Sequence, residues 1–298
     1  MKASAQLSYF REGTDLFERI RAGSDAYTPS FRKVAEYVIS HTQDVAFSPA
    51  ARVAGAAGVS ESVVVRFAGE LGYAGYPAMQ QAAQAYVRSQ LVGPFGRLEA
   101  LPITTSTTSA NILRSVLVQD VGNLQTTAEY TPNHDAFARA VDTLLEAQRV
   151  FVIGFRGLRH LAGLCAFLLD MASLETVLIT HGDAEGFQLA SRMRKGDTVF
   201  AFAFSRYTRA TKELVEMARG RGVPTVVVCD KVTAPAARKA DCVLQTATES
   251  SGFHNSYVAA VACINALIVA LSTKARARIA RRLREVEDVL PVDSFDVT

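Results

Sequence analysis

The sequence contains few of the features that mark secreted or metal-binding proteins. It has only four cysteines, which form no C-x-x-C pair and have no histidine at a metal-ligand spacing: Cys165, Cys229, Cys242 and Cys263. Three of them lie in apolar stretches, LCAF, VVVCD and VACIN. We therefore expect buried, reduced thiols and no metal site.

Long hydrophobic runs are also missing. The N-terminus, MKASAQLSYFREGTDLF, lacks the apolar core of a signal peptide. The most apolar stretch, residues 257–271, is too short to span a bilayer and ends in a basic segment. We therefore expect a cytoplasmic protein in a reducing compartment, with no membrane partner.

The chain has no large surplus of charge. Its 298 residues include 32 Lys and Arg against 29 Asp and Glu, so the formal net charge is +3. This value permits contact with nucleic acid but does not indicate it. Apolar residues make up 49%, which is enough for packed cores. The length suggests about two domains.

The first region, residues 1–92, has the pattern of a helical domain. Ser48 and Pro49 predict a capped helix start, and Gly58 predicts the end of that helix. A second helix is expected from Glu61. A short helix, a tight turn and a second helix have the proportions of a helix-turn-helix motif.

The second helix of this pair has two faces. Val64, Phe67 and Leu71 fall on one side, which predicts packing against the rest of the domain. An ordinary surface helix would show the same pattern. In a helix-turn-helix, however, the start of the second helix lies at the base edges of the major groove. The residues expected to contact DNA are Ser60, Glu61, Ser62, Val63 and Arg66.

The first region carries little net charge for a DNA-binding module. Residues 1–92 hold nine Lys and Arg against eight Asp and Glu, a net charge of +1. Because each phosphate contact adds affinity through counterion release, one copy should bind DNA weakly. Two copies on a palindromic site would bind more tightly, so we expect at least a dimer.

The composition changes after residue 92. Residues 93–109 hold two Pro, two Gly and a Ser/Thr cluster, which predicts a linker. Helices are expected over residues 110–130 and 134–147, the second capped by Asn133. From Arg149 onwards, short apolar runs alternate with helical stretches, as in βαβ units.

Five apolar runs predict five strands: RVFVIG, LETVLIT, DTVFAFAF, PTVVVCD and CVLQTA. Runs such as VFAFAF are apolar on both faces, as is typical of parallel strands covered on each side. The second region, residues 110–298, is therefore expected to be a doubly wound α/β domain with a five-stranded parallel sheet. A helix over residues 255–272 would close it.

Sheets of this kind bind ligands beyond the carboxyl ends of their strands. The first turn, GFRGLRHLA, has Arg156 and Arg159 where a dinucleotide-binding G-x-G-x-x-G has glycines, so we expect no nucleotide cofactor. The third turn, FSRYTRATKE, offers hydroxyls, guanidinium groups and a helix N-terminus to an anion. The alternative is that Thr208 only caps the helix.

Catalytic residues are harder to find. A proton-shuttling enzyme needs a base beside a bound carbonyl. The candidates are Glu249, His181, His254 and His160, but spacing fixes no pair of them, and each fits a cap or a surface position better than a catalytic one. The sequence therefore favours a binding protein. An aldose–ketose isomerase that uses Glu249 as its base is the alternative.

Two stretches resemble a known family. The run V-S-x-x-x-V-x-R-F-x-x-x-L-G-[FY]-x-G-Y-P, matched from Val59 to Pro77, resembles the N-terminal helix-turn-helix domain of RpiR/MurR-type transcriptional regulators. The stretch KGDTVFAFAFSRYTRATKELVEMARGRGVPTVVVCD resembles the sugar isomerase (SIS) domain that follows in that family. The resemblance implies a homodimeric or homotetrameric regulator that binds a DNA operator and responds to a sugar phosphate.

The chain departs from the family pattern at several positions. Val63 stands where many members have Thr, and Gly157 and Leu158 stand where the first turn often carries hydroxyls. Arg209 replaces the glycine of the S-G-x-T loop. These changes leave the effector open between a sugar phosphate and another small anion. The residues expected to bind it are Ser205, Arg206, Thr208, Thr211, Arg156 and Glu249.

Overall fold

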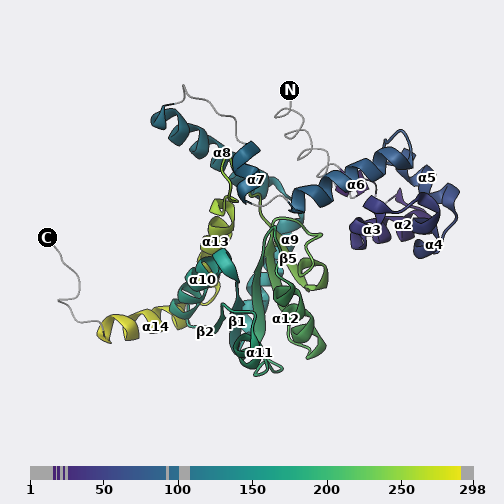
Figure 1. Cartoon of the computed structure of the whole chain (residues 1–298). Coiled ribbons are helices and arrows are strands. Elements are labelled where there is room, and N and C mark those ends of the chain that lie inside the picture. The colour runs from purple at the N-terminus through teal and green to yellow at the C-terminus, as the bar shows by residue number, and fades with distance from the viewer. Residues whose placement is uncertain are drawn as a thin grey trace. The chain divides into compact units, whose positions relative to one another are not determined.

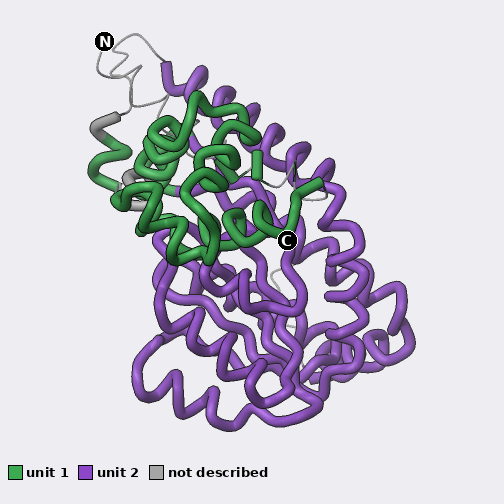
Figure 2. Tube along the Cα trace, turned by 90° about the vertical axis from the view of Figure 1, so that its right-hand side faces the viewer, with its two compact units in different colours: residues 1–107, 251–254 green, residues 108–250, 255–298 purple. Residues whose placement is uncertain are grey.

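The computed structural model describes residues 16–17, 19–20, 23, 26–91, 94–100 and 108–289. The chain divides into two compact units (Figure 2). The first comprises residues 1–107 with 251–254, and the second comprises residues 108–250 with 255–298. Helices form the first unit, and a parallel sheet with helices forms the second (Figure 1), so the predicted fold class is confirmed.

The first unit is a bundle of short helices around one apolar core. Its buried residues include Val34, Val53, Val64, Phe67 and Met79. The described helices are α2 (Pro29–Ser40), α3 (Thr42–Phe47), α4 (Ala50–Ala57), α5 (Glu61–Glu70), α6 (Tyr76–Leu91) and α7 (Pro94–Ala100).

The turn between α4 and α5 depends on a glycine. Gly58 has φ +67°, the left-handed conformation that commonly ends a helix. The backbone N–H of Val59 donates to the carbonyl of Ala54 at 3.0 Å and closes the last turn of α4. The predicted end of the helix at Gly58 is confirmed.

The predicted start of that helix was wrong. Helix α4 begins at Ala50 with Pro49 as its N-cap residue, and Ser48 instead ends α3. The hydroxyl of Ser48 donates to Asp44 Oδ1 at 2.8 Å. The hydroxyl of Ser48, which the sequence pattern predicted to cap α4, is thus bound to a carboxylate one turn earlier in α3.

Helix α6 holds the end of α3 through side chains. The hydroxyl of Tyr76 donates to the carbonyls of Val45 at 3.2 Å and Ser48 at 2.7 Å. The amide of Gln80 also donates to Ser48, at 2.8 Å, and that of Gln84 donates to Ala46 at 2.9 Å. These donors satisfy carbonyls that the end of a helix leaves open.

The second unit contains one five-stranded parallel sheet in the order β2-β1-β3-β4-β5. Its strands are β1 (Arg149–Ile153), β2 (Glu175–Ile179), β3 (Thr198–Ala203), β4 (Thr225–Cys229) and β5 (Cys242–Gln245). Its helices are α8 (Ser109–Glu129), α9 (Pro132–Glu146), α10 (Arg159–Met171), α11 (Ala184–Ala190), α12 (Arg209–Gly220), α13 (Val258–Lys274) and α14 (Arg276–Val289), with short 3-10 turns η2 (Arg156–Leu158) and η3 (Ala237–Lys239).

Helices cover both faces of the sheet (Figure 1). One core joins α9, α10 and α13 to a face that includes Val150 and Phe200. The other joins α11 and α12 to the opposite face, which includes Phe151 and Val199. Because the chain leaves β1 on one face and β3 on the other, the strand order reverses between these two neighbours. That reversal is where sheets of this kind place a ligand crevice.

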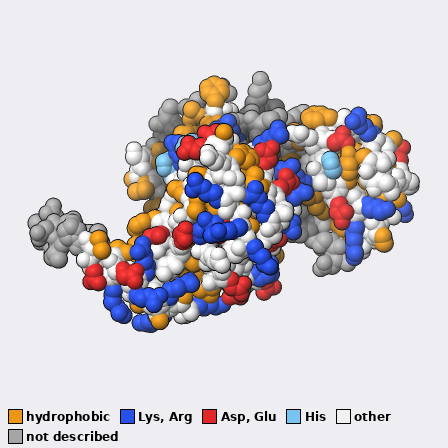
Figure 3. Space-filling view, turned by 90° about the horizontal axis from the view of Figure 1, so that it is seen from below, with side chains coloured by type: hydrophobic (Ala, Val, Ile, Leu, Met, Phe, Trp, Pro, Cys, Tyr) orange, Lys and Arg blue, Asp and Glu red, His pale blue; other side chains and the backbone are white. Residues whose placement is uncertain are grey.

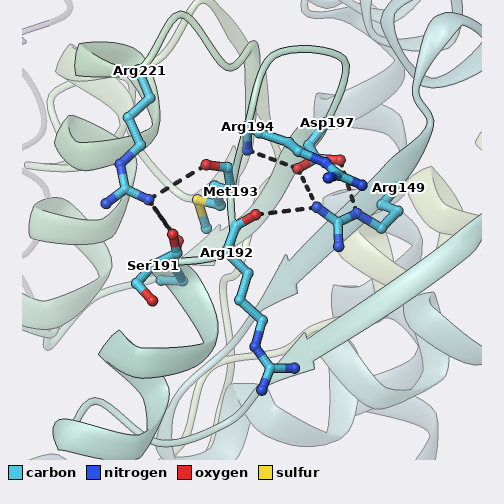
Figure 4. A network of polar contacts seen from close by, with 8 residues as sticks. Arg149, Ser191, Arg192, Met193, Arg194, Asp197 and Arg221 are labelled. Atoms are coloured by element: carbon cyan, nitrogen blue, oxygen red, sulfur yellow. Dashed lines mark hydrogen bonds and ion pairs between the residues drawn. The ribbon is translucent and has the colours of Figure 1, made fainter.

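The amino ends of the strands are held by arginines (Figure 4). Arg149 makes a bidentate ion pair with Asp197, with nitrogen–oxygen distances of 3.0 and 2.8 Å, and also donates to the carbonyl of Arg192 at 3.1 Å. Arg221 donates to the carbonyl of Ser191 at 2.8 Å. The loop before β3 is therefore fixed at the edge of the sheet opposite the ligand crevice.

One prediction before the sheet needs correction, the residue that caps α9. Helix α9 has Thr131 as its N-cap residue and Asn133 lies inside the helix, because Asn133 uses its amide to pair with Gln245. Residues 94–100, within the predicted linker 93–109, form α7. Residues 92–93 and 101–107 lie outside the described residues.

The four cysteines form no disulfide, and three of them are buried as predicted: Cys165, Cys229 and Cys242. Cys263 is half-buried, and burial raises the pKa of its thiol to about 11. Across the described residues, no single helix is long and apolar enough to cross a membrane. Only α13 and α14 taken together meet that test by length and composition, and they are bent by 107°.

Candidate functional site

Helix α5 has the two faces that the sequence predicts. Val64 and Phe67 are fully buried and Leu71 is nearly so. The side chains of Ser60, Glu61, Ser62 and Arg66 are exposed, and Val63 is half-buried against the helical core. The polar side chains of α5 are therefore accessible to another molecule.

The start of α5 is open to a ligand. Ser60 is the N-cap residue, but its hydroxyl makes no capping hydrogen bond and instead lies 3.0 Å from the hydroxyl of Ser62. The first backbone N–H groups of a helix favour an anion such as a DNA phosphate. The side chain of Arg66, one turn further on, makes no hydrogen bond or ion pair to any other described residue.

Charge is dispersed over the face shown in Figure 3. On the face shown in Figure 3, lysine and arginine side chains occur at several places with acidic side chains between them. This agrees with the small net charge of +3. With so small a net charge, we expect a DNA contact to depend on a few placed residues.

The turn after β1 is tightly closed. A Cβ atom added to Gly154 would lie 2.5 Å from the carbonyl oxygen of Leu158 and 2.7 Å from Cβ of Ala162, so only glycine fits there. Arg156 follows in the left-handed conformation, with φ +56°, and its side chain is exposed. The turn thus presents an arginine at the carboxyl end of β1, the strand that neighbours β3.

The turn after β3 brings two of the predicted hydroxyls together. Thr208 Oγ1 lies 2.7 Å from Thr211 Oγ1, and Thr211 is only 2% exposed. Thr208 is the N-cap residue of α12, but its hydroxyl makes no capping hydrogen bond. Arg206 is exposed with φ +70°, whereas Arg209 pairs with Glu213 at 2.6 Å.

Asp230 is a functional candidate that the sequence reasoning missed. The residue is 8% exposed, and its carboxylate accepts hydrogen bonds from the backbone N–H of Ser205 at 3.1 Å, from the Ser205 hydroxyl, and from the Tyr207 hydroxyl at 2.8 Å. A hydroxyl has one proton, so Ser205 cannot donate to an anion while this bond holds. The available signal was an aspartate ending the strand run PTVVVCD, at the ligand edge of the sheet.

Glu249 lies apart from the two turns. It follows β5, an outer strand that is separated from β3 by β4. Its side chain is exposed, and its backbone is held by Asn123 of α8. No described contact joins Glu249 to Arg156 or Arg206.

The remaining titratable candidates form no cluster at the crevice. The imidazole Nδ1 of His181 lies 3.0 Å from the hydroxyl of Thr180, and His160 Nε2 lies 3.4 Å from Nε of Arg159. Within the part of the chain that the structure describes, no three His, Cys, Asp or Glu side chains are placed to hold a metal ion. The turns after β1 and β3 instead carry guanidinium groups and hydroxyls, which suit the binding of an anion.

Comparison with known proteins gives two matching family models: the helix-turn-helix domain of the rpiR family over residues 14–90 and the SIS domain over residues 143–270. An uncharacterised helix-turn-helix transcriptional regulator of Caldanaerobacter subterraneus is 23% identical in an alignment 289 positions long that covers 93% of this chain and 97% of that protein.

Two solved structures are similar. The sugar isomerase domain of an RpiR transcription factor from Sphaerobacter thermophilus is 28% identical, with a TM-score of 0.57 over 60% of this chain and 99% of that one. The Vibrio vulnificus NanR protein, complexed with ManNAc-6P, is 21% identical, with a TM-score of 0.54 over 92% of this chain and 97% of that one. The chain therefore belongs to the RpiR family of transcriptional regulators, with a helix-turn-helix domain followed by a SIS domain.

Proposed function

We propose that this regulator binds its operator through α5 and senses a small anion, in the first instance a sugar phosphate, at the crevice between β1 and β3. The contact between the hydroxyls of Thr208 and Thr211, beside the exposed Arg206, carries the proposal. It lies where the strand order reverses and at the N-terminus of α12, whose N–H groups favour an anion.

The DNA contact is assigned to the exposed start of α5. Ser60 and Ser62 offer hydroxyls to phosphates or bases, and Glu61 offers an acceptor to a cytosine amino group. Arg66 offers a guanidinium that fits guanine or phosphate. Val63 is half-buried, so it would add an apolar contact at most.

The effector contact is assigned to Arg206, Thr208 and Thr211, with Arg156 from the neighbouring turn. The NanR structure supports a sugar phosphate, because a protein of similar fold holds ManNAc-6P. Binding of the effector alone would not regulate DNA binding, since the effector must bind more tightly to one state of the protein, either the one that binds the operator or the one that does not. A coupling of about 1–3 kcal/mol would change operator affinity roughly 5–150-fold.

A second copy of this chain is the partner that best fits the outer face of α8. Helix α8 exposes a stripe of apolar residues, with Leu113 61% and Val118 64% exposed. A shallow groove on this face is lined by Ala110, Leu113, Arg114, Leu117, Val118 and Val121. Helix α13, packed beside α8, is mostly apolar, and its residue Val269 is 66% exposed. Helices of this character are normally covered.

A homodimer formed through α8 and α13 would also offset the weak charge of the first region. Helix-turn-helix dimers bind two half-sites, so the contacts of both copies add.

The predicted boundaries, 1–92, 93–109 and 110–298, stay proposals, as does the cytoplasmic location. In this account the chain is a regulator and not an enzyme.

The test combines DNA and ligand binding. Fluorescence anisotropy on the upstream DNA of the gene itself should show binding that changes when one member of a panel is added. The panel contains sugar phosphates, with ManNAc-6P among them, and organic acids, each also titrated by calorimetry. The double variant Thr208→Ala, Thr211→Ala should lose both ligand binding and the DNA response. Ser191→Ala, which removes an exposed hydroxyl at the amino ends of the strands, is the control.

The isomerase alternative has its own readout. Nuclear magnetic resonance of the same sugar phosphates would show aldose–ketose conversion, and Glu249→Gln would abolish it if Glu249 were the base. Turnover that depends on Glu249, with no effect of any ligand on DNA binding, would contradict the proposed function.

A further inference from the structure

We infer that Asp230 is a positioning residue of the effector site, whose carboxylate holds Arg206 in a left-handed conformation and so presents its guanidinium to an anion. This inference rests on the proposed function of the crevice between β1 and β3. It adds a residue, Asp230, that would act on the ligand only through Arg206.

Left-handed arginines are the first observation. Among the described residues, three that are not glycine have a left-handed φ: Arg156, Ser173 and Arg206. Ser173 follows the end of α10, where such a residue commonly terminates a helix. The two arginines instead occupy the turns after β1 and β3, which are neighbours in the sheet.

Glycine would adopt both turn conformations without steric cost, because it has no Cβ atom. Residues with side chains persist in this region only where the surrounding structure fixes them, and such positions gather at ligand sites. Arg206 therefore needs both a structural restraint and a use for its side chain.

The restraint is visible on each side of Arg206. The residue before it, Ser205, donates to Asp230 through its backbone N–H at 3.1 Å and through its hydroxyl. The residue after it, Tyr207, donates its hydroxyl to the other carboxylate oxygen at 2.8 Å. One buried carboxylate at the end of β4 thus holds both neighbours of Arg206, and the backbone between them cannot relax independently.

The use is indicated by what the guanidinium does not contact. Arg206 is exposed and has no ion pair or hydrogen bond to another residue in the described ranges. Arg209, three residues later, is instead bound to Glu213 at 2.6 Å. A group held in its binding conformation before the ligand arrives binds more tightly, because less ordering remains to be done.

Charge alone would work in the opposite direction. A carboxylate beside an anion site repels the ligand, so Asp230 should weaken binding if it acted only through its charge. If removing the charge of Asp230 weakens phosphate binding, the cause cannot be simple electrostatics, because loss of a nearby negative charge alone would strengthen that binding.

The variants are Asp230→Asn and Tyr207→Phe, with inorganic phosphate as the probe in calorimetric titrations of the full chain. Asparagine replaces one acceptor oxygen by a donor, and phenylalanine removes the hydroxyl without changing charge. We expect each variant to bind phosphate roughly tenfold more weakly, which corresponds to about 1.4 kcal/mol. Tighter or unchanged binding by Asp230→Asn, or unchanged binding by Tyr207→Phe, would overturn the inference. If Asp230→Asn fails to fold, Tyr207→Phe alone decides.

Asp241 provides a matched control. It accepts from the backbone N–H of Thr225 at 3.0 Å and from its hydroxyl at 2.7 Å, the same pattern as Asp230 with Ser205, but at the amino ends of the strands. Asp241→Asn should leave phosphate binding unchanged. If it weakens binding as much as Asp230→Asn does, the effect is general loosening of the sheet and the inference fails.

The backbone restraint has a second readout that needs no ligand. Arg206→Gly should melt at a higher temperature than Arg206→Ala, because alanine keeps the disfavoured conformation. The difference should shrink in the Tyr207→Phe background, where the restraint is weaker. If wild type binds no phosphate, the proposed anion site itself fails. If wild type binds phosphate and the variants Asp230→Asn and Tyr207→Phe bind it equally well, only the role of Asp230 fails.

Discussion

The side-chain amide of Asn123 in α8 exchanges two hydrogen bonds with the backbone of Glu249, 126 residues further along the chain. Its Oδ1 accepts from the Glu249 N–H at 3.0 Å and its Nδ2 donates to the Glu249 carbonyl at 2.8 Å. Asn123 is 1% exposed, so both bonds are shielded from water.

The same device recurs along the segment after β5. Asn133 exchanges two bonds with the backbone of Gln245, at 2.9 and 2.7 Å, and Thr127 accepts from the N–H of Ala247 at 2.9 Å. Alternate backbone positions are thus paired by side chains, much as a further strand would pair them. Helices α8 and α9 therefore protect the outer edge of the sheet from pairing with another chain.

Removing one of these amides should destabilise the SIS domain. Asn123→Ala leaves a partly buried N–H and a partly buried carbonyl of Glu249 without this partner, so we expect a loss of about 1–3 kcal/mol in the free energy of unfolding. Urea unfolding followed by circular dichroism measures it. Gln125→Ala, an exposed position on the same helix, is the control and should change stability by less than about 0.5 kcal/mol. Equal effects of the two substitutions would contradict the assigned role of Asn123.

Arg66→Ala should weaken operator binding without unfolding the protein. The side chain is exposed on the polar face of α5, and one good DNA contact contributes about 1–3 kcal/mol. Anisotropy on the upstream DNA measures the affinity, and circular dichroism checks the fold. Lys33→Ala, an exposed cation on α2, removes the same charge away from α5. Unchanged affinity of Arg66→Ala, or an equal loss from Lys33→Ala, would show that Arg66 makes no specific contact.

Local patterns predicted the elements well. The apolar runs placed all five strands, because a strand covered on both faces must be apolar throughout. Gly58 predicted the turn of the helix-turn-helix because its left-handed conformation favours glycine. Both signals lie within a few residues of the structure that they specify.

The contacts that shape the candidate site could not be predicted in this way. Asp230 acts on Ser205, 25 residues earlier, and Asn133 acts on Gln245, 112 residues later. Asn133 resembled a helix cap because its partner was invisible to a local pattern. In the same way, the hydroxyl of Ser205 resembled a ligand donor until its bond to a neighbouring strand was known.

Charged substitutions on the outer face of α8 should dissociate the proposed homodimer. Leu113→Asp with Leu117→Asp places two carboxylates on an apolar stripe that is exposed in the single chain, so the fold should survive while association is lost. Analytical ultracentrifugation at micromolar concentration measures the mass. Thr126→Asp, exposed on the same helix but away from the stripe, is the control. Wild type that sediments as a monomer, or a double variant that still dimerises, would rule out this face.

Raising the pH should destabilise the helix-turn-helix domain through Tyr76. Burial, followed by the nearby charge of Asp44, raises the pKa of Tyr76 from 10.0 to about 12. The folded state therefore holds the phenolic proton more tightly than the unfolded state. The resulting stability is fully present below pH 10.0 and is lost as the pH rises through about 12.

Tyr76→Phe separates this titration from the others. The variant should be less stable by about 1 kcal/mol at neutral pH, because the carbonyls of Val45 and Ser48 lose a donor. Its stability should then fall less steeply than that of wild type above about pH 10. Urea unfolding across this range, with Tyr130→Phe as a control outside the domain, measures both slopes. Parallel slopes for wild type and Tyr76→Phe would mean that the buried hydroxyl of Tyr76 does not hold its proton more tightly in the folded protein.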